Sequence, residues 1–275
     1  MAQTKQAIGI FDSGYGGLTI LDRIQHELPE YDFIYLGDNA RTPYGTRSYD
    51  VVYDYTLEAV EQLFSMGCQL VILACNTASA KALRTIQQRD LPKIDASRRV
   101  LGVIRPSVEA VGQLTKSGHV GILATPGTVR SDSYPLEIAK LFPEITVVQE
   151  ACPMWVPLVE NNEYLSSGGE FFIRKHVENI LQKNSRIDTL ILGCTHYPLL
   201  ETVIRKYLPS EIRLVAQGEI VARSLKDYLN RHPEMDVRCT KGSSLEFYTT
   251  EFVENFEEKA GVFLSRDLRA KHITL

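Results

Sequence analysis

The sequence predicts an α/β fold of two similar lobes, each a parallel sheet flanked by helices, related by pseudo-two-fold symmetry with the active site in the cleft between them. Short aliphatic runs alternate with helical segments, a pattern typical of parallel sheets covered by helices. The run 71–75 (Val-Ile-Leu-Ala-Cys) matches 190–194 (Leu-Ile-Leu-Gly-Cys), and the opening strand at 8–14 matches 120–127. A degenerate duplication of one α/β unit explains both matches.

Each expected strand is a short β-branched or aliphatic run bounded by turn residues, and these runs lie at 7–12, 32–37, 69–74, 100–104, 119–124, 145–149, 188–193 and 212–216. Helices are expected at 16–27, 50–66, 77–89, 106–116, 131–141, 169–183, 198–207, 218–231 and 248–260. In such sheets the ligand lies at the carboxyl ends of the strands. Asp12, Cys75, Thr125 and Cys194 all fall at such ends.

The chain is expected to cross twice between the lobes. Its 275 residues exceed the usual size of one domain. The polar, proline-containing stretch 90–99 indicates the first crossing, and the turn at 209–211 indicates the second. We therefore assign 1–98 plus 212–275 to the first lobe and 99–211 to the second.

The composition, with 44% apolar and 23% charged residues, is ordinary for a soluble globular protein. A formal net charge of −4 gives no electrostatic reason to expect nucleic acid or an anionic membrane as a partner. No apolar run approaches the length of a membrane span, and residues 1–6 lead into a strand without a signal-like segment. Five cysteines at long spacings do not form a disulfide framework, so we expect free thiols and a cytoplasmic location.

The loop at 12–18, after the first strand, is rich in glycine and opens a helix. Glycines let the backbone approach a ligand closely and point N–H groups at an anion. The spacing Gly-x-Gly-Gly differs from the dinucleotide fingerprint Gly-x-Gly-x-x-Gly, and Asp12 stands where a phosphate would be repelled. A nucleotide site and a turn without any ligand remain the alternatives.

Cys75 and Cys194 end two matching strands, and each is followed by polar residues. The backbone dipole at the start of a helix stabilises a thiolate, so we expect the pKa of these cysteines to fall towards neutrality and the thiolates to act as bases. Asn76, Thr77 and Thr195 supply neutral donors suited to holding a carboxylate.

Two other interpretations of these cysteines stay open at this point. Each of them, taken singly, also fits a buried small hydrophobic residue. Cys194 and His196, two positions apart, could begin a structural zinc site, although the sequence offers no second closely spaced Cys/His pair.

Five blocks of sequence make a resemblance to a known family specific. The strings at 10–18, 37–45, 74–79, 152–160 and 192–199 closely resemble those of glutamate racemases and stand in the family's order. The resemblance implies a cofactor-independent isomerase that interconverts L- and D-glutamate, with two cysteines on opposite faces of the α-carbon. It also implies that the D-glutamate supplies peptidoglycan synthesis for the cell wall.

The resemblance assigns roles to particular residues. Cys75 and Cys194 would be the two bases, with Asp12 beside the first and His196 beside the second to tune thiol protonation. The residues that would hold the substrate are Asp12, Ser13, Tyr44, Gly45, Asn76, Thr77, Thr195 and His196. Glu160 matches a carboxylate that helps near the second cysteine, although a surface or capping glutamate fits nearly as well. We expect no cofactor and no metal, and a homodimer is left open.

Three stretches depart from the family's pattern. The link at 90–99 looks longer than usual, and Arg105 and Ser107 stand where a different polar residue and a glycine are common. Gln217 stands where an Asp-Ser-Gly-like turn is more frequent. None of these positions touches the inferred chemistry, but they could alter lobe motion, subunit contacts or regulation.

The alternatives within and outside this enzyme class are few. An aspartate or hydantoin racemase would use the same cysteine pair with a different pocket. A periplasmic-type binding protein would also suit two lobes, but the paired thiols argue against it. We interpret the remaining candidates, His119, His176, Cys68, Cys152 and Cys239, as structural.

Overall fold

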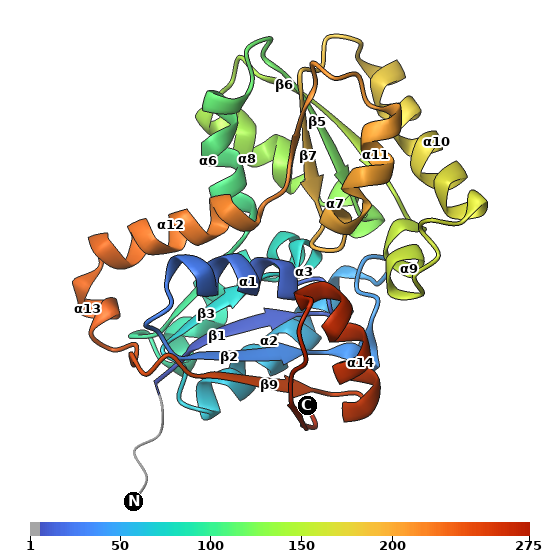
Figure 1. Ribbon diagram of the computed structural model, residues 1–275. Helices are drawn as coiled ribbons and strands as arrows, with labels where there is room; N and C mark the ends of the chain where they lie inside the picture. Colours follow the sequence, from blue (N-terminus) through green and yellow to red (C-terminus); the bar gives the residue numbers. More distant parts are fainter. Residues whose placement is uncertain (1–5) are drawn as a thin grey trace, which may run out of the picture.

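Two parallel β-sheets organise residues 6–275, the part of the chain that the computed structural model describes (Figure 1). The first sheet contains β1 (Ile8–Asp12), β2 (Phe33–Gly37), β3 (Leu70–Leu73), β4 (Arg99–Gly102), β9 (Leu245–Thr249) and β10 (Ala270–His272), in the order β10-β9-β2-β1-β3-β4. The second contains β5 (His119–Ala124), β6 (Thr146–Ala151), β7 (Thr189–Gly193) and β8 (Arg213–Val215), in the order β6-β5-β7-β8. Every neighbouring pair is parallel.

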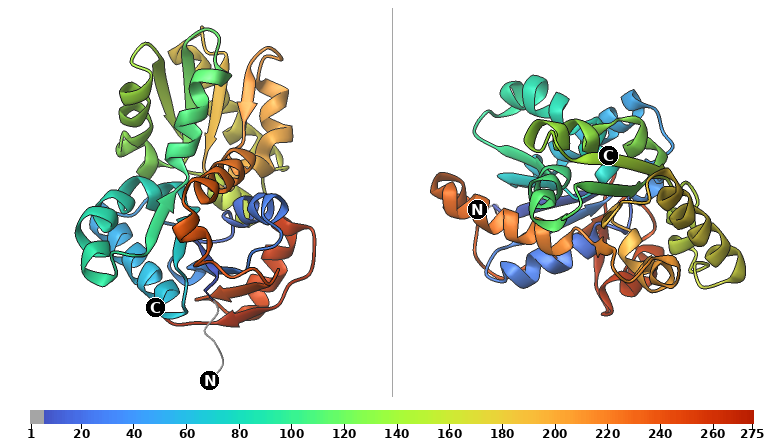
Figure 2. Two further views of the ribbon diagram at one scale, coloured as in Figure 1. Left: turned by 90° about the vertical axis from the view of Figure 1, so that its left-hand side faces the viewer. Right: turned by 90° about the horizontal axis from the view of Figure 1, so that it is seen from above.

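Helices cover both faces of each sheet (Figures 1 and 2). The longer ones are α1 (Leu18–Glu27), α2 (Tyr49–Ser65), α6 (Ile104–Leu114), α8 (Ser133–Leu141), α10 (Ser167–Lys183), α11 (Glu201–Tyr207), α12 (Gly218–Arg231) and α14 (Val253–Leu264). Short ones are α3 (Asn76–Lys81), α4 (Leu83–Thr85), α5 (Leu91–Ile94), α7 (Pro126–Arg130), α9 (Trp155–Glu160), α13 (Pro233–Asp236), the 3-10 turns η1 (Asn39–Arg41) and η3 (Tyr197–Leu200), and the π-helical turn η2 (Ile86–Asp90). The predicted class, parallel sheets flanked by helices, is confirmed.

Both faces of each sheet are buried, which explains why the strands are almost continuously apolar. Along β1, Ile8 and Ile10 pack into the core beneath α1, whereas Phe11 packs into the core beneath α2. In the second lobe, Ile122 belongs to the core beneath α6 and α8, and Leu123 to the core beneath α10 and α11. This alternation has the period of two that an extended chain imposes.

Two strands near the lobe crossings lie in the sheet opposite to the one expected. β4 pairs with β3 in the first sheet, and β8 pairs with β7 in the second. The expected borders, before residue 99 and before residue 212, therefore come one strand too early. The polar stretch 90–99 does not connect the two lobes. It contains the last residue of η2, all of α5 and the turn into β4, which all belong to the first lobe.

β9 and β10 were not predicted from the sequence. A helix was expected from 248, whereas β9 continues to Thr249 and α14 begins at Val253. The helix expected at 77–89 is broken into α3, α4 and η2. These differences leave the carboxyl ends of β1, β3, β5 and β7 at the junction of the lobes, where the predicted site residues lie.

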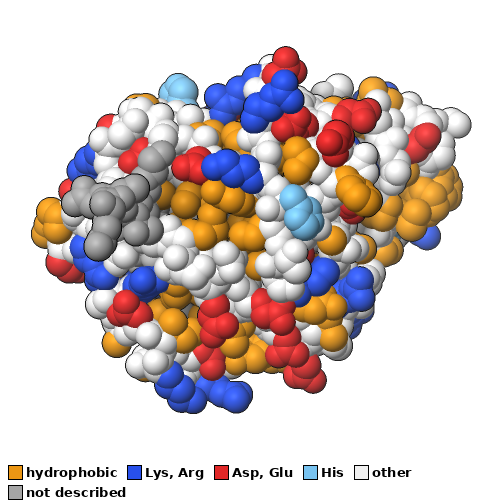
Figure 3. Space-filling model, turned by 90° about the horizontal axis from the view of Figure 1, so that it is seen from below, with side chains coloured by type: hydrophobic (Ala, Val, Ile, Leu, Met, Phe, Trp, Pro, Cys, Tyr) orange, Lys and Arg blue, Asp and Glu red, His pale blue; other side chains and the backbone are white. Residues whose placement is uncertain are grey.

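Among residues 6–275, no helix is both long and apolar enough to cross a membrane. Acidic and basic side chains are interspersed on the face that Figure 3 shows. All five cysteines are free and buried, which includes the free thiols expected for some of them.

Asp188 ties the turn before β5 to the start of β7. Its carboxylate accepts hydrogen bonds of 2.6 Å from Thr115 Oγ1 and from the N–H groups of Lys116 and Ser117. Burial opposes ionisation, but the hydrogen bonds outweigh it and lower the pKa of Asp188 to about 2. Because the folded-state pKa lies below the ordinary value of 3.8, this stabilisation is present above about pH 4 and is lost as the pH falls towards 2.

We therefore expect Asp188→Asn to lower the free energy of unfolding at pH 7 by about 1–2 kcal/mol. This value is smaller than the pKa shift alone would suggest, because solvent around the carboxylate screens its interactions. The difference from the wild type should shrink between pH 4 and pH 2 in urea titrations. Asp22→Asn, at a side chain that is 45% exposed, is the control and should change little. A pH-independent difference for Asp188→Asn would contradict this account.

Candidate active site

A cavity of about 90 Å³ lies between the lobes, and both Cys75 and Cys194 line it. Seven further predicted residues line it as well: Ser13, Tyr44, Gly45, Asn76, Thr77, Thr195 and His196. Its volume is several times the space that one buried water needs, which suits a molecule of the size of an amino acid better than a nucleotide. No lysine or arginine is among the described residues that line it.

Cys75 follows β3 and caps the first turn of α3. Its Sγ lies 3.3 Å from Ser13 Oγ and accepts a 3.5 Å hydrogen bond from the N–H of Ala78. Only 6% of the residue is exposed. Because β1 and β3 are neighbours in the sheet, their carboxyl ends bring Ser13 and Cys75 together.

The expected fall in the pKa of Cys75 is wrong for this structure. Burial, followed by the nearby carboxyl group of Asp12, raises the pKa of the Cys75 thiol to about 12. The Ser13 hydroxyl and the N–H of Ala78, in the first turn of α3, act to lower this pKa but do not outweigh burial. The surroundings of Cys75 therefore favour its neutral thiol over its thiolate.

Cys194 belongs to a chain of three polar groups. Its Sγ lies 3.9 Å from His196 Nδ1, and His196 Nε2 lies 3.0 Å from Glu160 Oε1. Burial opposes a charge on His196, but the contacts with Cys194 and Glu160 outweigh it and raise the pKa of His196 to about 10. Glu160 ends α9 and contacts His196 directly, so it is not a surface or capping residue only.

Asp12 lies behind the cavity, at the end of β1. One carboxylate oxygen accepts a 2.9 Å hydrogen bond from the N–H of Gly14, and the other accepts one of 3.4 Å from Thr195 Oγ1 in the other lobe. Burial raises the pKa of Asp12, although His196 and the backbone N–H groups act against it. Asp12 thus connects the glycine-rich loop to the strand end that carries Cys194.

Two of the expected substrate-binding side chains are already engaged. The Tyr44 hydroxyl donates to Asp38, and burial with this carboxylate raises the pKa of Tyr44. The Asn76 amide donates to Gln217 Oε1 and accepts from the Tyr134 hydroxyl. Both residues line the cavity, but these polar groups bond within the protein.

The lobes meet closely around the cavity. Thr77 Oγ1 and Thr125 Oγ1 are 2.9 Å apart across the junction, and the N–H of Gly127 donates to the carbonyl of Gly45 at 2.7 Å. A Cβ at Gly45 would lie 2.8 Å from Thr125 Cβ. A side chain at Gly16 would overlap Thr195 Oγ1 and His196 Nδ1. These glycines therefore permit the approach of the two lobes.

Several residues of the site were not predicted as site residues. The cavity is also lined by Thr42, Pro43, Thr46, Thr125, Cys152, Pro153, Val156 and Pro157. Thr125 was placed correctly at the ligand-binding edge, after β5, but was not assigned a role in the site. Cys152 follows β6 in the same way, so its interpretation as purely structural overlooks its place in the cavity wall.

Phe263, in α14, is a further residue near the site. Its ring stands edge-on to His196, with centroids 5.6 Å apart, and stacks on Tyr15 of the glycine-rich loop at 6.1 Å. It packs against core residues of both lobes. No sequence signal predicts this contact, because 64 positions separate Phe263 from Leu199, the last residue of the nearest motif.

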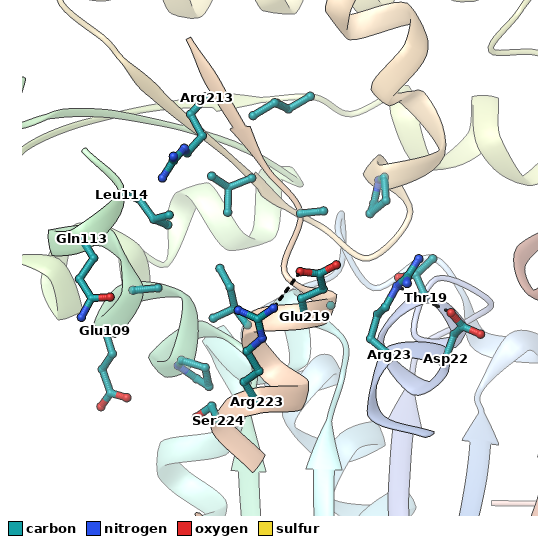
Figure 4. Close-up of a pocket in the computed structure, with 18 of the residues that line it drawn as sticks. Thr19, Asp22, Arg23, Glu109, Gln113, Leu114, Arg213, Glu219, Arg223 and Ser224 are labelled. Atoms are coloured by element: carbon teal, nitrogen blue, oxygen red, sulfur yellow. Dashed lines mark ion pairs between the residues drawn. The ribbon is translucent and has the colours of Figure 1, made fainter. Parts of the chain in front are cut away.

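A larger groove of about 1190 Å³ lies on another side of the lobe junction, between α1, α6, β8 and α12 (Figure 4). Arg23 and Arg223 line it, and each pairs with a neighbouring carboxylate, Asp22 or Glu219. Neither cysteine lines it. The smaller cavity is therefore the candidate active site, since it holds the reactive groups. Among residues 6–275, no group of three or more His, Cys, Asp or Glu side chains is arranged to hold a metal ion.

Comparison with known proteins decides the family. The model of the Asp/Glu/Hydantoin racemase family matches residues 16–225. This chain belongs to that racemase family. A glutamate racemase from Ruegeria sp. (strain TM1040) is 40% identical over 272 residues, which cover 95% of this chain and 98% of the relative.

Solved racemase structures have the same fold. A glutamate racemase isoform from Bacillus anthracis superposes with a TM-score of 0.89 at 33% identity, covering 99% of each chain. The glutamate racemase from Francisella tularensis, solved in complex with D-glutamate, has a TM-score of 0.87 at 32% identity and covers 99% of this chain and 98% of its own.

The glycine contact between the lobes gives a direct test of the site. Gly16→Ala should push Thr195 and His196 away and lower racemase kcat/KM by about 10- to 100-fold, because a shift of about 1 Å is enough to misplace a proton-transfer group. Thermal unfolding should show that the fold remains. Gly168→Ala, where the nearest atom lies 3.9 Å from the added Cβ, is the control. Wild-type activity in Gly16→Ala would contradict the described lobe contact.

Proposed function

We propose that this chain is a glutamate racemase that interconverts L- and D-glutamate with Cys75 and Cys194 as its two bases. The observation that carries the proposal is that Cys75 from the first lobe and Cys194 from the second, at the ends of matching strands, line one small cavity. A substrate whose enantiomers exchange needs an acid–base group on each face of its α-carbon, and two like groups meet that need.

In this mechanism, the thiolate of one cysteine removes the α-proton and the thiol of the other delivers a proton to the opposite face. The roles exchange in the reverse direction. Each turnover leaves the two cysteines with their protonation states interchanged, and proton exchange with solvent or between neighbouring groups restores them. His196, between Cys194 and Glu160, is suited to move that proton on one side.

The raised pKa of Cys75 sets a requirement for the substrate. A cation near the sulfur favours the thiolate. No lysine or arginine lines the described part of the cavity, and the imidazole of His196 lies beside Cys194, so the α-ammonium group of the substrate would supply a cation beside Cys75. Binding of an α-amino acid would thus help to create the base that acts on it.

Neutral hydrogen-bond donors must offset the negative charge that develops on the substrate carboxylate during proton removal. Ser13, Thr77 and Thr195 place buried hydroxyl groups at the cavity, and each would turn from its partner in the protein, Cys75, Thr125 or Asp12, towards the substrate. Donors fixed in a site with little water stabilise such a charge more than water does. Without a cofactor, these groups and the closed lobes would supply most of the rate enhancement.

We favour glutamate as the substrate because the relative from Ruegeria, which is similar to this protein along nearly the whole chain, is a glutamate racemase. We further propose that the enzyme acts in the cytoplasm and that its D-glutamate supplies peptidoglycan synthesis. An aspartate or hydantoin racemase is the alternative, with the same thiols and a pocket of another length.

Polarimetry with EDTA-treated, dialysed protein tests the substrate and the independence from cofactors. L-Glutamate should lose its optical rotation completely without added pyridoxal phosphate. L-Aspartate should react at least about a hundredfold more slowly, because the shorter side chain leaves donors unpaired at about 1–3 kcal/mol each. Activity that returns only with pyridoxal phosphate, or equal turnover of aspartate, would overturn this assignment.

Replacement of either thiol tests the two-base mechanism. Cys75→Ser and Cys194→Ser should each lower glutamate racemisation by about 10²- to 10⁴-fold, because a hydroxyl is a far weaker acid. Each variant should still eliminate chloride from β-chloroglutamate of one hand, since that reaction needs one base on one face. Cys239→Ser, in another buried thiol outside the cavity, is the matched control. Identical preference of the two variants for one hand would contradict the opposed arrangement.

A further inference from the structure

A buried hydrogen-bond network lies where the chain crosses between the lobes. Gln217 stands at the return crossing, just before α12, and only 2% of it is exposed. Its Nε2 donates to Ser107 Oγ at 2.7 Å and to the Tyr134 hydroxyl at 2.8 Å, with the carbonyl of Val103 at 3.3 Å. Val103 and Ser107 belong to the first crossing, so one side chain joins both crossings.

The other end of Gln217 reaches the active site. Its Oε1 accepts a 2.7 Å hydrogen bond from Asn76 Nδ2, and the Tyr134 hydroxyl donates to Asn76 Oδ1 at 2.8 Å. The Asn76 amide is thus fixed at both ends. Asn76 directly follows Cys75 and is the first residue of α3, whose Ala78 N–H bonds to the Cys75 sulfur.

We propose that Gln217 is a positioning residue that fixes Cys75 relative to the second lobe through Asn76. We call Asn76, Ser107, Tyr134 and Gln217 the polar pivot. This inference rests on the proposed function, because it assigns the pivot to one of the two proton transfers. A buried network whose amide groups are all paired holds one arrangement, and loss of a member leaves costly unpaired groups.

The polar pivot supports Cys75 but not Cys194. Cys194 is held by His196 and Glu160, neither of which belongs to the polar pivot. Disturbance of Gln217 should therefore act mainly on the face that Cys75 serves.

The length of Gln217 suits its place in the polar pivot. Its side chain spans from Ser107 Oγ, at 2.7 Å from Nε2, to Asn76 Nδ2, at 2.7 Å from Oε1. A shorter side chain at 217 could not reach both partners.

The test compares Gln217→Met, which keeps the size of the side chain and removes its polar atoms, with the wild type. Racemase kcat/KM should fall by about 10- to 100-fold. Since the equilibrium constant between enantiomers is one, kcat/KM falls equally in both directions, so elimination must resolve the two faces. There, a thiolate takes the α-proton of β-chloroglutamate, the C–H electrons form a double bond to the β-carbon, and chloride leaves with the C–Cl electrons.

Elimination from the hand that Cys75 serves should fall with kcat/KM, and elimination from the other hand should stay close to wild type. Cys194→Ser identifies the hand that Cys75 serves. Gln217→Asn, which keeps the amide but is one methylene shorter, should act in the same way if Gln217→Met does not fold. The control is Gln69→Met. Gln69 is a buried glutamine in the lobe that carries Cys75, but it lies outside the cavity, so its replacement should leave both eliminations unchanged.

Equal loss for both hands, or no loss, would overturn the role of Gln217. Failure of the proposed function has a different signature, because the wild type itself would then leave glutamate unchanged. In that case, alkylation by iodoacetamide, resolved for each thiol by mass spectrometry, still tests the pivot. Gln217→Met should then raise the rate at Cys75 several-fold over that at Cys194, and an unchanged ratio would overturn the inference.

Discussion

The close contact of the two lobes around one cavity is the constraint on which the site depends. Cys75 belongs to the first lobe and Cys194 to the second, so neither lobe alone could place these two thiols about a single carbon. The contact needs a backbone without side chains at Gly16 and Gly45, and it is completed by the hydrogen bond between Thr77 and Thr125. The parallel sheets contribute by ending β1, β3, β5 and β7 at this junction.

Burial creates a second constraint, because it favours neutral groups at a site whose proposed chemistry needs a thiolate. It raises the pKa of Cys75 and of Asp12. On the other side, the contacts of His196 with Cys194 and Glu160 overcome burial and favour a charged imidazole. The two thiols thus stand in unlike surroundings, although the proposed mechanism asks the same chemistry of both. The ammonium group of a bound amino acid would reduce this difference at the Cys75 side.

The sequence predicted the strand ends well because that signal is local. Aliphatic runs that stop at Asp12, Cys75, Thr125 and Cys194 correctly indicated one edge of each sheet, and the resemblance to a family supplied the remaining motif residues. The strand positions of β1–β8 were also found. The lobe borders failed by one strand each, because a polar, proline-containing link can form helical turns within a lobe as well as a connection between lobes.

What the sequence could not predict depends on contacts between distant segments. Tyr44 and Asn76 were expected to hold substrate with their side chains, but Asp38 and Gln217 already bond to them. The edge-on contact of Phe263 with His196 joins positions 67 apart, and no periodicity reports it. The pKa of Cys75 depends on the burial around it, whereas the sequence showed only the helix that follows.

In the proposed mechanism, Cys75 and Cys194 act on opposite faces of one α-carbon. The most direct measurement follows L-glutamate in D₂O at early times, with deuterium at the α-carbon determined separately in the recovered L-glutamate and in the D-glutamate formed. We expect deuterium in the D-glutamate formed and almost none in the recovered L-glutamate, because one cysteine removes the proton and the other delivers deuterium. Equal deuterium in both enantiomers, or a product that retains the original proton, would contradict it.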